Sequence, residues 1–314
     1  MDCSYCPFSY RNHAQGRTHD FDFQIRSIKK ILTSKSFTKS SFNKLIIYGG
    51  EPLIYFDQIK RVISQYRRLR GRGLVKICTN GILITDDIIT YAKDNVVTFS
   101  INMDGNFATV RKIKSISKTE WDKLLSNLKK LLTEKIYFDF STTLTPNFLG
   151  KFNAQMKFLL KLRPRMIGFN FLRDNFSQKR FKVADSGRYL RKAMSLVFKN
   201  KSKNFNRDKK LMAYKRNVQI ADCICSGLGL TVLADGQYTT CGIFPSQKYR
   251  NVSDIKKALR ENYTRLFSNE RLNEKIRNLP TFGGGCAKLA GKDNDKFASY
   301  NAVESFNRFK YEKI

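Results

Sequence analysis

Residues 44–69 read KLIIYGGEPLIYFDQIKRVISQYRRL, and this stretch decides the fold. A short apolar run at 44–48 leads into Gly49 and Gly50, and then into a segment, 56–69, whose apolar residues have helical spacing. An apolar run, a glycine turn and an amphipathic helix in this order are typical of one strand–helix unit of a parallel sheet.

The same order recurs along the first 180 residues, where short apolar runs alternate with amphipathic stretches. The pattern predicts strands at 75–78, 96–101, 138–144 and 166–172, and helices at 21–32, 86–93, 118–132 and 148–162. Most of the strands end in small or polar residues, which read GGEP, TNG, DG and TP. Because ligands of parallel α/β proteins bind at the carboxyl ends of the strands, we expect a site along one edge of a parallel barrel or half-barrel.

Apolar residues make up 41% of the chain, which is enough for a sizeable core. No apolar run approaches the ~18 residues that span a bilayer. The first residues lack the charged and then apolar pattern of a signal peptide. We therefore expect a cytoplasmic protein without a membrane span.

Positive charge dominates the chain, because 59 Lys and Arg stand against 26 Asp and Glu and give a net charge of +33. Such a surplus favours polyanionic partners such as nucleic acid, acidic peptides or anionic lipid. The basic residues are spread along the chain, however, as in a lysine-rich proteome where the surplus has no functional role. The densest stretch, FKNKSKNFNRDKK at 198–210, reads as a solvated connector.

The chain has seven cysteines, at positions 3, 6, 78, 223, 225, 241 and 286. An odd number in a chain without a signal peptide argues against a disulfide framework and favours metal binding or redox chemistry. Cys78 stands alone in a strand-like run and is predicted to be a small buried hydrophobic residue.

Four segments together resemble a known enzyme family. Cys3 and Cys6 form a CxxC pair, which alone would also suit a zinc site or a redox pair. In order along the chain, however, stand MDCSYCPF, YGGEPLI, ICTNGIL and FSINMDG, and this set resembles the radical S-adenosylmethionine (radical SAM) superfamily. It looks most like the branch with an added SPASM or twitch domain. The resemblance implies a partial (β/α)6 TIM-like barrel, its first strand missing, with a small C-terminal cysteine-rich domain.

The family's cluster motif is Cys-x3-Cys-x2-Cys, whose three thiolates hold a [4Fe–4S] cluster and leave one iron open for SAM. Cys3 and Cys6 match its second and third cysteines, and Tyr5 matches the aromatic residue before the last one. The first cysteine would fall two places before Met1, so we expect in-frame upstream codons to encode it. Genuine loss of this cysteine is the alternative. The implied activity is that of an oxidoreductase that cleaves SAM to a 5′-deoxyadenosyl radical, which abstracts hydrogen from a substrate.

The resemblance also implies SAM-binding residues at three strand ends. Gly49, Gly50, Glu51 and Pro52 match the family's GGEP segment, whose backbone and carboxylate engage the methionine amino group; Asn80, Asn102 and Asp104 fall in two further segments. The alternatives are structural. Pro52 suits the first turn of a helix, and the Asp-Gly pair at 104–105 suits a tight turn.

The C-terminal cysteines resemble the ligands of an auxiliary cluster. A hairpin with its turn at Asp235–Gly236 would bring Cys225 and Cys241 together, and Cys286 ends a glycine-rich segment; Cys223 is a possible fourth ligand or a core residue. Four thiols at most allow one auxiliary [4Fe–4S] cluster, and the alternative is a zinc site.

These features divide the chain into a radical SAM core at 1–181, a linker helix and basic connector at 182–220, and a SPASM/twitch-like auxiliary cluster domain at 221–314. We expect modification of a peptide or protein, for which the positive charge of the chain favours an acidic one, with a reducing partner such as flavodoxin or ferredoxin. The alternatives are an inactive homologue that serves as a binding scaffold and a nucleic-acid-associated protein.

Overall fold

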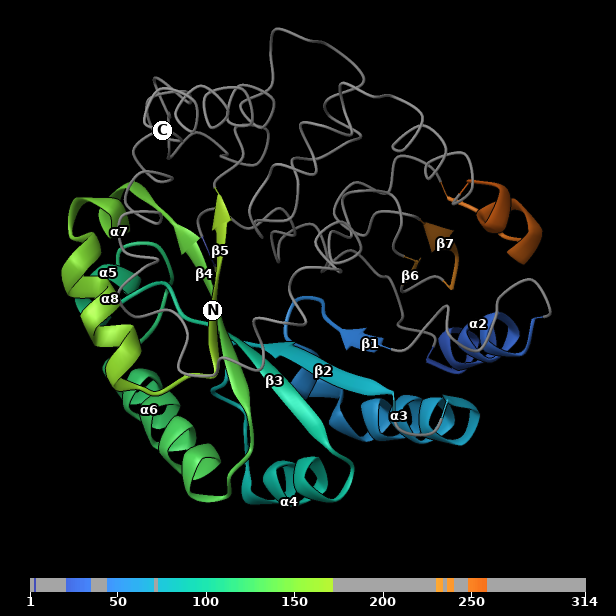
Figure 1. Ribbon diagram of the computed structural model, residues 1–314, viewed down its shortest axis with the longest axis horizontal. Helices are drawn as coiled ribbons and strands as arrows, with labels where there is room; N and C mark the ends of the chain where they lie inside the picture. The colour runs from blue at the N-terminus through green and yellow to red at the C-terminus, as the bar shows by residue number, and fades with distance from the viewer. Residues whose placement is uncertain are drawn as a thin grey trace, which may run out of the picture. The chain divides into compact units, whose positions relative to one another are not determined.

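A computed structural model describes Cys3 and residues 21–34, 44–70, 73–171, 230–233, 236–239 and 248–258 (Figure 1). The chain divides into two compact units. The first contains Met1–Thr18 and Lys39–Lys182, and the second contains His19–Thr38 and Val183–Ile314. The second unit therefore includes residues 19–38, which the sequence-based division placed in the core.

The first unit is built on a five-stranded parallel sheet in the order β1-β2-β3-β4-β5. The strands are β1 (Lys44–Ile47), β2 (Leu74–Thr79), β3 (Val97–Asn102), β4 (Phe138–Leu144) and β5 (Met166–Phe171). This confirms the predicted α/β class and all the strands predicted in this region. Closure of the sheet into a partial (β/α)6 barrel remains a prediction.

The connections between these strands are helical. They comprise η1 (Pro52–Tyr55, a 3-10 helix), α3 (Phe56–Arg70), α4 (Asp86–Asp94), α5 (Phe107–Val110), α6 (Lys118–Thr133), α7 (Pro146–Gly150) and α8 (Phe152–Lys161). The longest, α6, begins with a capping box in which Ser117 and Glu120 each accept the other's backbone N–H. The single helix predicted at 148–162 is wrong, because Lys151 leaves helical geometry and separates α7 from α8.

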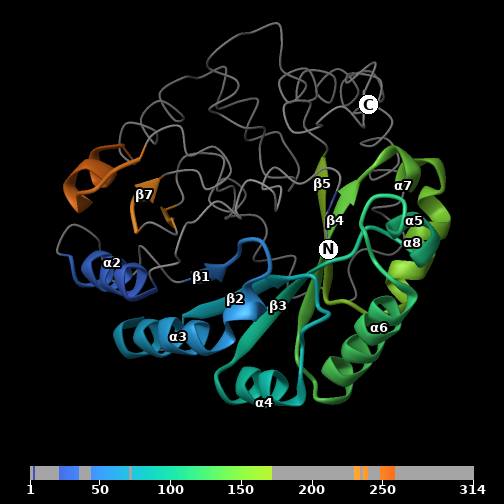
Figure 2. The same ribbon diagram turned by 180° about the vertical axis from the view of Figure 1, so that it is seen from behind.

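Helices α3, α4, α6 and α8 lie along one face of the sheet (Figures 1 and 2). Strand residues of this outer face are apolar and buried: Val75, Ile77, Phe99, Ile101, Phe138 and Phe140. Residues that alternate with them form the inner face, which we define by Lys76, Cys78, Ser100, Asn102, Asp139 and Ser141. The core therefore lies between the sheet and the helices. Most side chains that β2, β3 and β4 direct to the inner face are polar.

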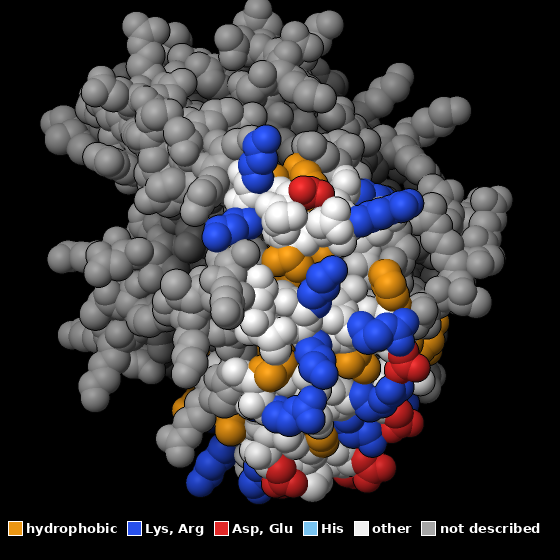
Figure 3. All heavy atoms as spheres, turned by 90° about the vertical axis from the view of Figure 1, so that its right-hand side faces the viewer, with side chains coloured by type: hydrophobic (Ala, Val, Ile, Leu, Met, Phe, Trp, Pro, Cys, Tyr) orange, Lys and Arg blue, Asp and Glu red, His pale blue; other side chains and the backbone are white. Residues whose placement is uncertain are grey.

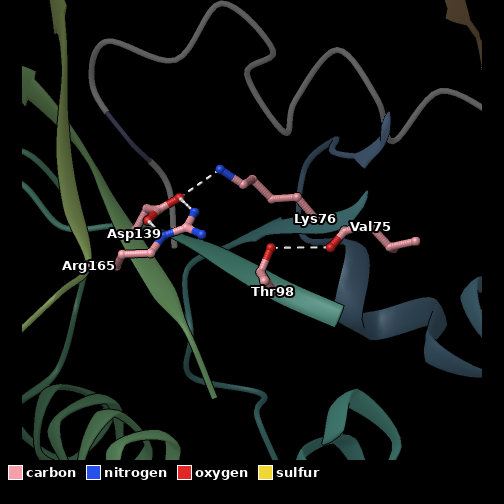
Figure 4. A network of polar contacts seen from close by, with 5 residues as sticks. All are labelled: Val75, Lys76, Thr98, Asp139 and Arg165. Atoms are coloured by element: carbon pink, nitrogen blue, oxygen red, sulfur yellow. Dashed lines mark hydrogen bonds and ion pairs between the residues drawn. The ribbon is translucent and has the colours of Figure 1, made fainter. Parts of the chain in front are cut away.

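A charge cluster joins three strand regions on the inner face (Figure 4). Lys76 of β2 reaches past β3 to Asp139 of β4, with Nζ 2.7 Å from Oδ2. Arg165, directly before β5, donates to both carboxylate oxygens of Asp139, from Nε at 3.0 Å and from Nη2 at 2.9 Å. One buried carboxylate is thus shared by two cations.

In the second unit, helix α2 (Phe21–Thr33) packs on a hairpin of two short antiparallel strands, β6 (Thr231–Val232) and β7 (Tyr238–Thr239). Ser27 Oγ donates to the carbonyl of Gly236 at 3.1 Å, and the Tyr238 hydroxyl donates to the carbonyl of Ser27 at 3.3 Å. Gly236 has a φ of +71°, and an added Cβ would lie 1.6 Å from the Phe23 ring. The predicted hairpin is therefore present, and its turn requires this glycine.

No helix among the described residues combines the length and the apolar character that crossing a membrane would require.

Candidate functional site

The predicted SAM-binding segments come together because all five strands of the sheet are parallel. The residues after β1, β2 and β3 therefore lie along the same edge of the sheet, at the carboxyl ends of the strands. Two polar clusters occupy this edge. One surrounds Glu51 and the other surrounds Asp104.

The carboxylate of Glu51 connects the ends of β1 and β2. Its Oε1 accepts from the backbone N–H of Leu53 at 3.2 Å and from the hydroxyl of Thr79 at 2.6 Å. Its Oε2 accepts from the backbone N–H of Asn80 at 2.8 Å. A carboxylate has about four acceptor positions, so these three donors leave one position on half-buried Glu51 for a further donor.

The backbone beside Glu51 leaves room for a ligand. Gly49 and Gly50 are exposed, and a Cβ added to either would meet no described protein atom within 4 Å. The described protein atoms therefore do not demand glycine here, whereas a ligand that lies against the backbone would. Open backbone beside a carboxylate with one unused acceptor position fits a small molecule that carries an ammonium group, as SAM does. Pro52 begins η1, so the structural reading of that residue also holds.

The segment after β2 is a tight turn that holds Asn80 in place. The Asn80 side chain accepts from the backbone N–H of Ile82 at 2.9 Å. Asn127 of α6 donates to the carbonyls of Gly81 and Ile82 at 2.8 and 3.1 Å. Gly81 has a φ of +81°, in the left-handed region. The predicted binding residue Asn80 thus sits in a turn that is fixed from its own side chain and from α6.

Replacing Gly81 by Ala should destabilise the protein by about 1–3 kcal/mol, because a side chain there adopts a strained φ. The new Cβ would also lie 2.7 Å from Leu124 Cδ1. Thermal unfolding followed by circular dichroism measures the change. Gly168→Ala in β5 is the matched control, since its nearest contact is an ordinary 3.6 Å to the Phe140 carbonyl. Equal melting temperatures for the two variants would contradict this account of the turn.

Asp104, one of the SAM-binding residues that the sequence resemblance implies, lies inside the protein. Its side chain is 0% exposed, with Oδ2 2.7 Å from Lys114 Nζ. Its Oδ1 accepts from the backbone N–H of Thr143 in β4 at 2.6 Å. In this arrangement Asp104 supports the neighbouring strand ends, and half-buried Asn102 is the residue of this segment that stands nearer the surface.

Lys114 is the residue of this region that the sequence analysis missed. It is 3% exposed, and its ammonium group contacts Asp104 and Asn102. The chain contains many lysines, so a buried one has no distinguishing mark in the sequence. The one available signal is its position between two isoleucines, Ile113 and Ile116, in a short stretch that follows the Asp-Gly pair.

Of the predicted metal ligands, the structure describes Cys3. It is half-buried and forms an isolated antiparallel β-bridge with Lys114. The other predicted ligands, together with Tyr5, lie outside the described residues: Cys6, Cys223, Cys225, Cys241 and Cys286. Within the described ranges, no group of three His, Cys, Asp or Glu side chains could hold a metal ion. The cluster ligands therefore remain predictions.

Cys78 lies on the inner face and is half-buried rather than fully buried. Burial is the main cause that raises the pKa of its thiol, and nearby Lys76 partly opposes the rise. The thiol is therefore protonated at neutral pH, which agrees with the prediction that Cys78 acts as a small hydrophobic residue.

A sequence model of the radical SAM superfamily matches residues 1–162. This match covers more than half of the 314 residues, and the chain belongs to the radical SAM superfamily.

Among curated proteins, the chain is similar to a cysteine-type anaerobic sulfatase-maturating enzyme of Clostridium novyi (strain NT). The two are 23% identical over 176 residues, which cover 54% of this chain and 47% of the relative. The match thus spans about half the length of that relative.

Solved structures support the fold. The sulfatase-maturating enzyme anSMEcpe, with bound AdoMet and the Kp18Cys peptide, has a TM-score of 0.65 at 14% identity, covering 100% of this chain and 94% of that chain. SuiB of Streptococcus suis, bound to its precursor peptide SuiA, has a TM-score of 0.55 at 14% identity, covering 98% and 70% of the two chains. Coproporphyrinogen III oxidase of Escherichia coli has a TM-score of 0.51 at 15% identity, covering 77% and 58%.

Proposed function

We propose that this protein is a radical SAM enzyme that cleaves SAM reductively and abstracts hydrogen from a peptide or protein. Membership of the superfamily supplies the reaction class. The single structural observation that carries the proposal is the edge of the sheet, where Glu51 keeps an unused acceptor position beside the open backbone of Gly49 and Gly50.

Each part of the site has its own task in this proposal. Cys3 and Cys6 would hold the [4Fe–4S] cluster with a third thiolate encoded upstream, and the reduced cluster would supply the electron that cleaves SAM. Glu51 binds the amino group of SAM, and Gly49 and Gly50 let the ligand lie against the backbone. Asn80 and Asn102, on the two neighbouring strand ends, bind the rest of the cofactor. These residues orient the reacting bond and limit the access of water.

The C-terminal part is proposed to hold one auxiliary [4Fe–4S] cluster, with Cys225, Cys241, Cys286 and Cys223 as ligands. The β6–β7 hairpin supports this assignment, because it lies between Cys225 and Cys241 in the sequence and folds the chain back between them. Visible absorption spectroscopy separates the cluster from a zinc site, since iron–sulfur clusters absorb visible light and zinc does not.

The proposed substrate is a peptide or protein, and its acidic character is inferred from the charge of the chain. Two structurally similar proteins were solved with bound peptides, anSMEcpe and SuiB. Lys and Arg side chains are spread over the face drawn in Figure 3, among acidic and apolar ones. The net charge of +33 would also favour encounter with an acidic electron donor of the flavodoxin or ferredoxin class.

The decisive experiment begins with the reading frame upstream of Met1, which should encode a cysteine two positions before it. The protein that includes these codons is then reconstituted with iron and sulfide without air, reduced, and given SAM. We expect visible absorption and formation of 5′-deoxyadenosine. A colourless product, or a coloured one that never cleaves SAM, would instead favour an inactive scaffold.

Replacing Gly50 by Ala should weaken SAM binding while the stability of the protein changes by less than about 0.5 kcal/mol. The reason is that the methyl group would enter space that no described protein atom occupies. Equilibrium dialysis with the reconstituted protein measures binding. Gly150→Ala is the control, because its added Cβ also meets none of the described atoms within 4 Å. If both variants bind SAM equally well, the ligand does not lie against Gly50.

A further inference from the structure

Lys114 is a buried cation to which the proposed function assigns no task. It follows α5 by a short turn, and its side chain is 2% exposed. A buried ammonium group is costly unless it is paired and hydrogen-bonded. The burial of this ammonium group at the same edge of the sheet as Glu51 and Asn102 therefore requires a structural explanation.

The side chain of Lys114 uses its donors on the end of β3. Nζ lies 2.7 Å from Asp104 Oδ2 and 3.2 Å from the carbonyl oxygen of Asn102, and it also contacts Asn102 Oδ1. An ammonium group has three donors, and these three acceptors match that number. The other oxygen of Asp104 accepts from Thr143, so the contact extends to β4.

The main chain of Lys114 contacts a different part of the first unit. It forms an isolated antiparallel β-bridge with Cys3, which is the described member of the CxxC pair. One residue therefore joins two segments that are about 100 residues apart in the sequence. Its backbone pairs with Cys3, and its side chain contacts the end of β3 that carries Asn102.

We propose that Lys114 is a positioning residue that ties Cys3 to the end of β3. This inference rests on the proposed function, because Cys3 gains its importance as a cluster ligand and Asn102 as part of the SAM site. Lys114 sets the distance between the cluster and the cofactor segment.

The first test needs neither the cluster nor SAM. The metal-free full chain is treated with a short pulse of N-ethylmaleimide, and peptide mapping by mass spectrometry gives the labelling rate of Cys3. We expect Lys114→Met to raise this rate about tenfold, because it weakens the link between Cys3 and the end of β3. The labelling rate follows the fraction of molecules in which Cys3 is locally released. Lys114→Arg keeps the charge and several donors, and should show a smaller rise.

Lys76→Met is the matched control, because it also removes a lysine that pairs with a buried aspartate, but in a contact between β2 and β4 that involves neither Cys3 nor Asn102. It should leave Cys3 labelling unchanged. Cys78, half-buried in β2, reports general unfolding in every variant. Cys3 labelling at the wild-type rate in Lys114→Met, or an equal rise in Lys76→Met, would overturn the proposal. If Lys114→Met does not fold, Asn102→Ala decides in the same way, with a smaller rise expected.

A second readout connects the tether to the cofactor. In protein that includes the upstream codons and is reconstituted to equal iron content, addition of SAM should change the electron paramagnetic resonance signal of the reduced cluster less in Lys114→Met than in wild type. If wild type itself fails to reconstitute, the proposed function fails, whereas the labelling result for Cys3 still stands or falls by itself.

Discussion

Replacing Asp139 by Asn should lower the free energy of unfolding by about 3–5 kcal/mol, because the change leaves two cations on the inner face without their shared anion. The Asp139 side chain is 2% exposed, while those of Lys76 and Arg165 are 13% and 25% exposed. Asparagine is almost the same size as aspartate, so packing is kept and the loss is electrostatic. Urea unfolding followed by circular dichroism measures the change.

The cost should be strongly asymmetric within the charge cluster. Lys76→Met leaves Asp139 with Arg165, which still donates to both carboxylate oxygens, so this variant should lose much less stability than Asp139→Asn. The double variant removes one of the stranded cations together with the acid. We therefore expect it to be no less stable than Asp139→Asn alone. The coupling energy between Lys76 and Asp139 should then be about 1 kcal/mol or more, within the ~0.5–3 kcal/mol range for contacting residues. Strictly additive losses would show that Lys76 and Asp139 are not energetically coupled.

The parallel sheet could be predicted from the sequence because the signal is local. Strand β4 was predicted at its observed bounds, 138–144, since all of its residues except Asp139 and Ser141 are apolar or β-branched. The strand ends were found for the same reason, because glycine and asparagine mark where the backbone must turn. The edge of the sheet that carries the candidate site followed from these two patterns together.

The polar contacts could not be predicted, because they depend on which residues meet across the fold. Lys76 and Asp139 are 63 positions apart, and the hydrogen bond from Ser27 to Gly236 spans 209 positions. Nothing in their local sequence distinguishes them from surface residues in a chain with 59 basic side chains. The same limit explains why Asp104 was offered as a ligand residue. Its burial depends on Lys114, whose position is set by the turn after α5.

Replacing Glu51 by Gln should weaken SAM binding about 10- to 100-fold, because a hydrogen bond to a charged group contributes about 1.5–3 kcal/mol. The amide keeps the shape of the side chain but brings a donor where Glu51 has only acceptors. The NH2 group of the amide would then face another donor. This donor would be either the pair from Leu53 and Thr79 or the N–H of Asn80. The ends of β1 and β2 should therefore loosen together with the cofactor site. Equilibrium dialysis of SAM with reconstituted protein measures the first effect, and thermal unfolding measures the second.

Glu120→Gln provides the comparison that separates a general loss of carboxylate from the loss at this edge. Glu120 also accepts a backbone N–H at the start of a helix, and glutamine serves equally well at this position of a capping box. That variant should bind SAM as wild type does. If Glu51→Gln also binds SAM with wild-type affinity and melts at a lower temperature, then the Glu51 carboxylate only links the ends of β1 and β2. The amino group of the cofactor would in that case bind elsewhere. Loss of affinity at an unchanged melting temperature would mean the reverse, that the unused acceptor position of Glu51 matters more than its three occupied ones.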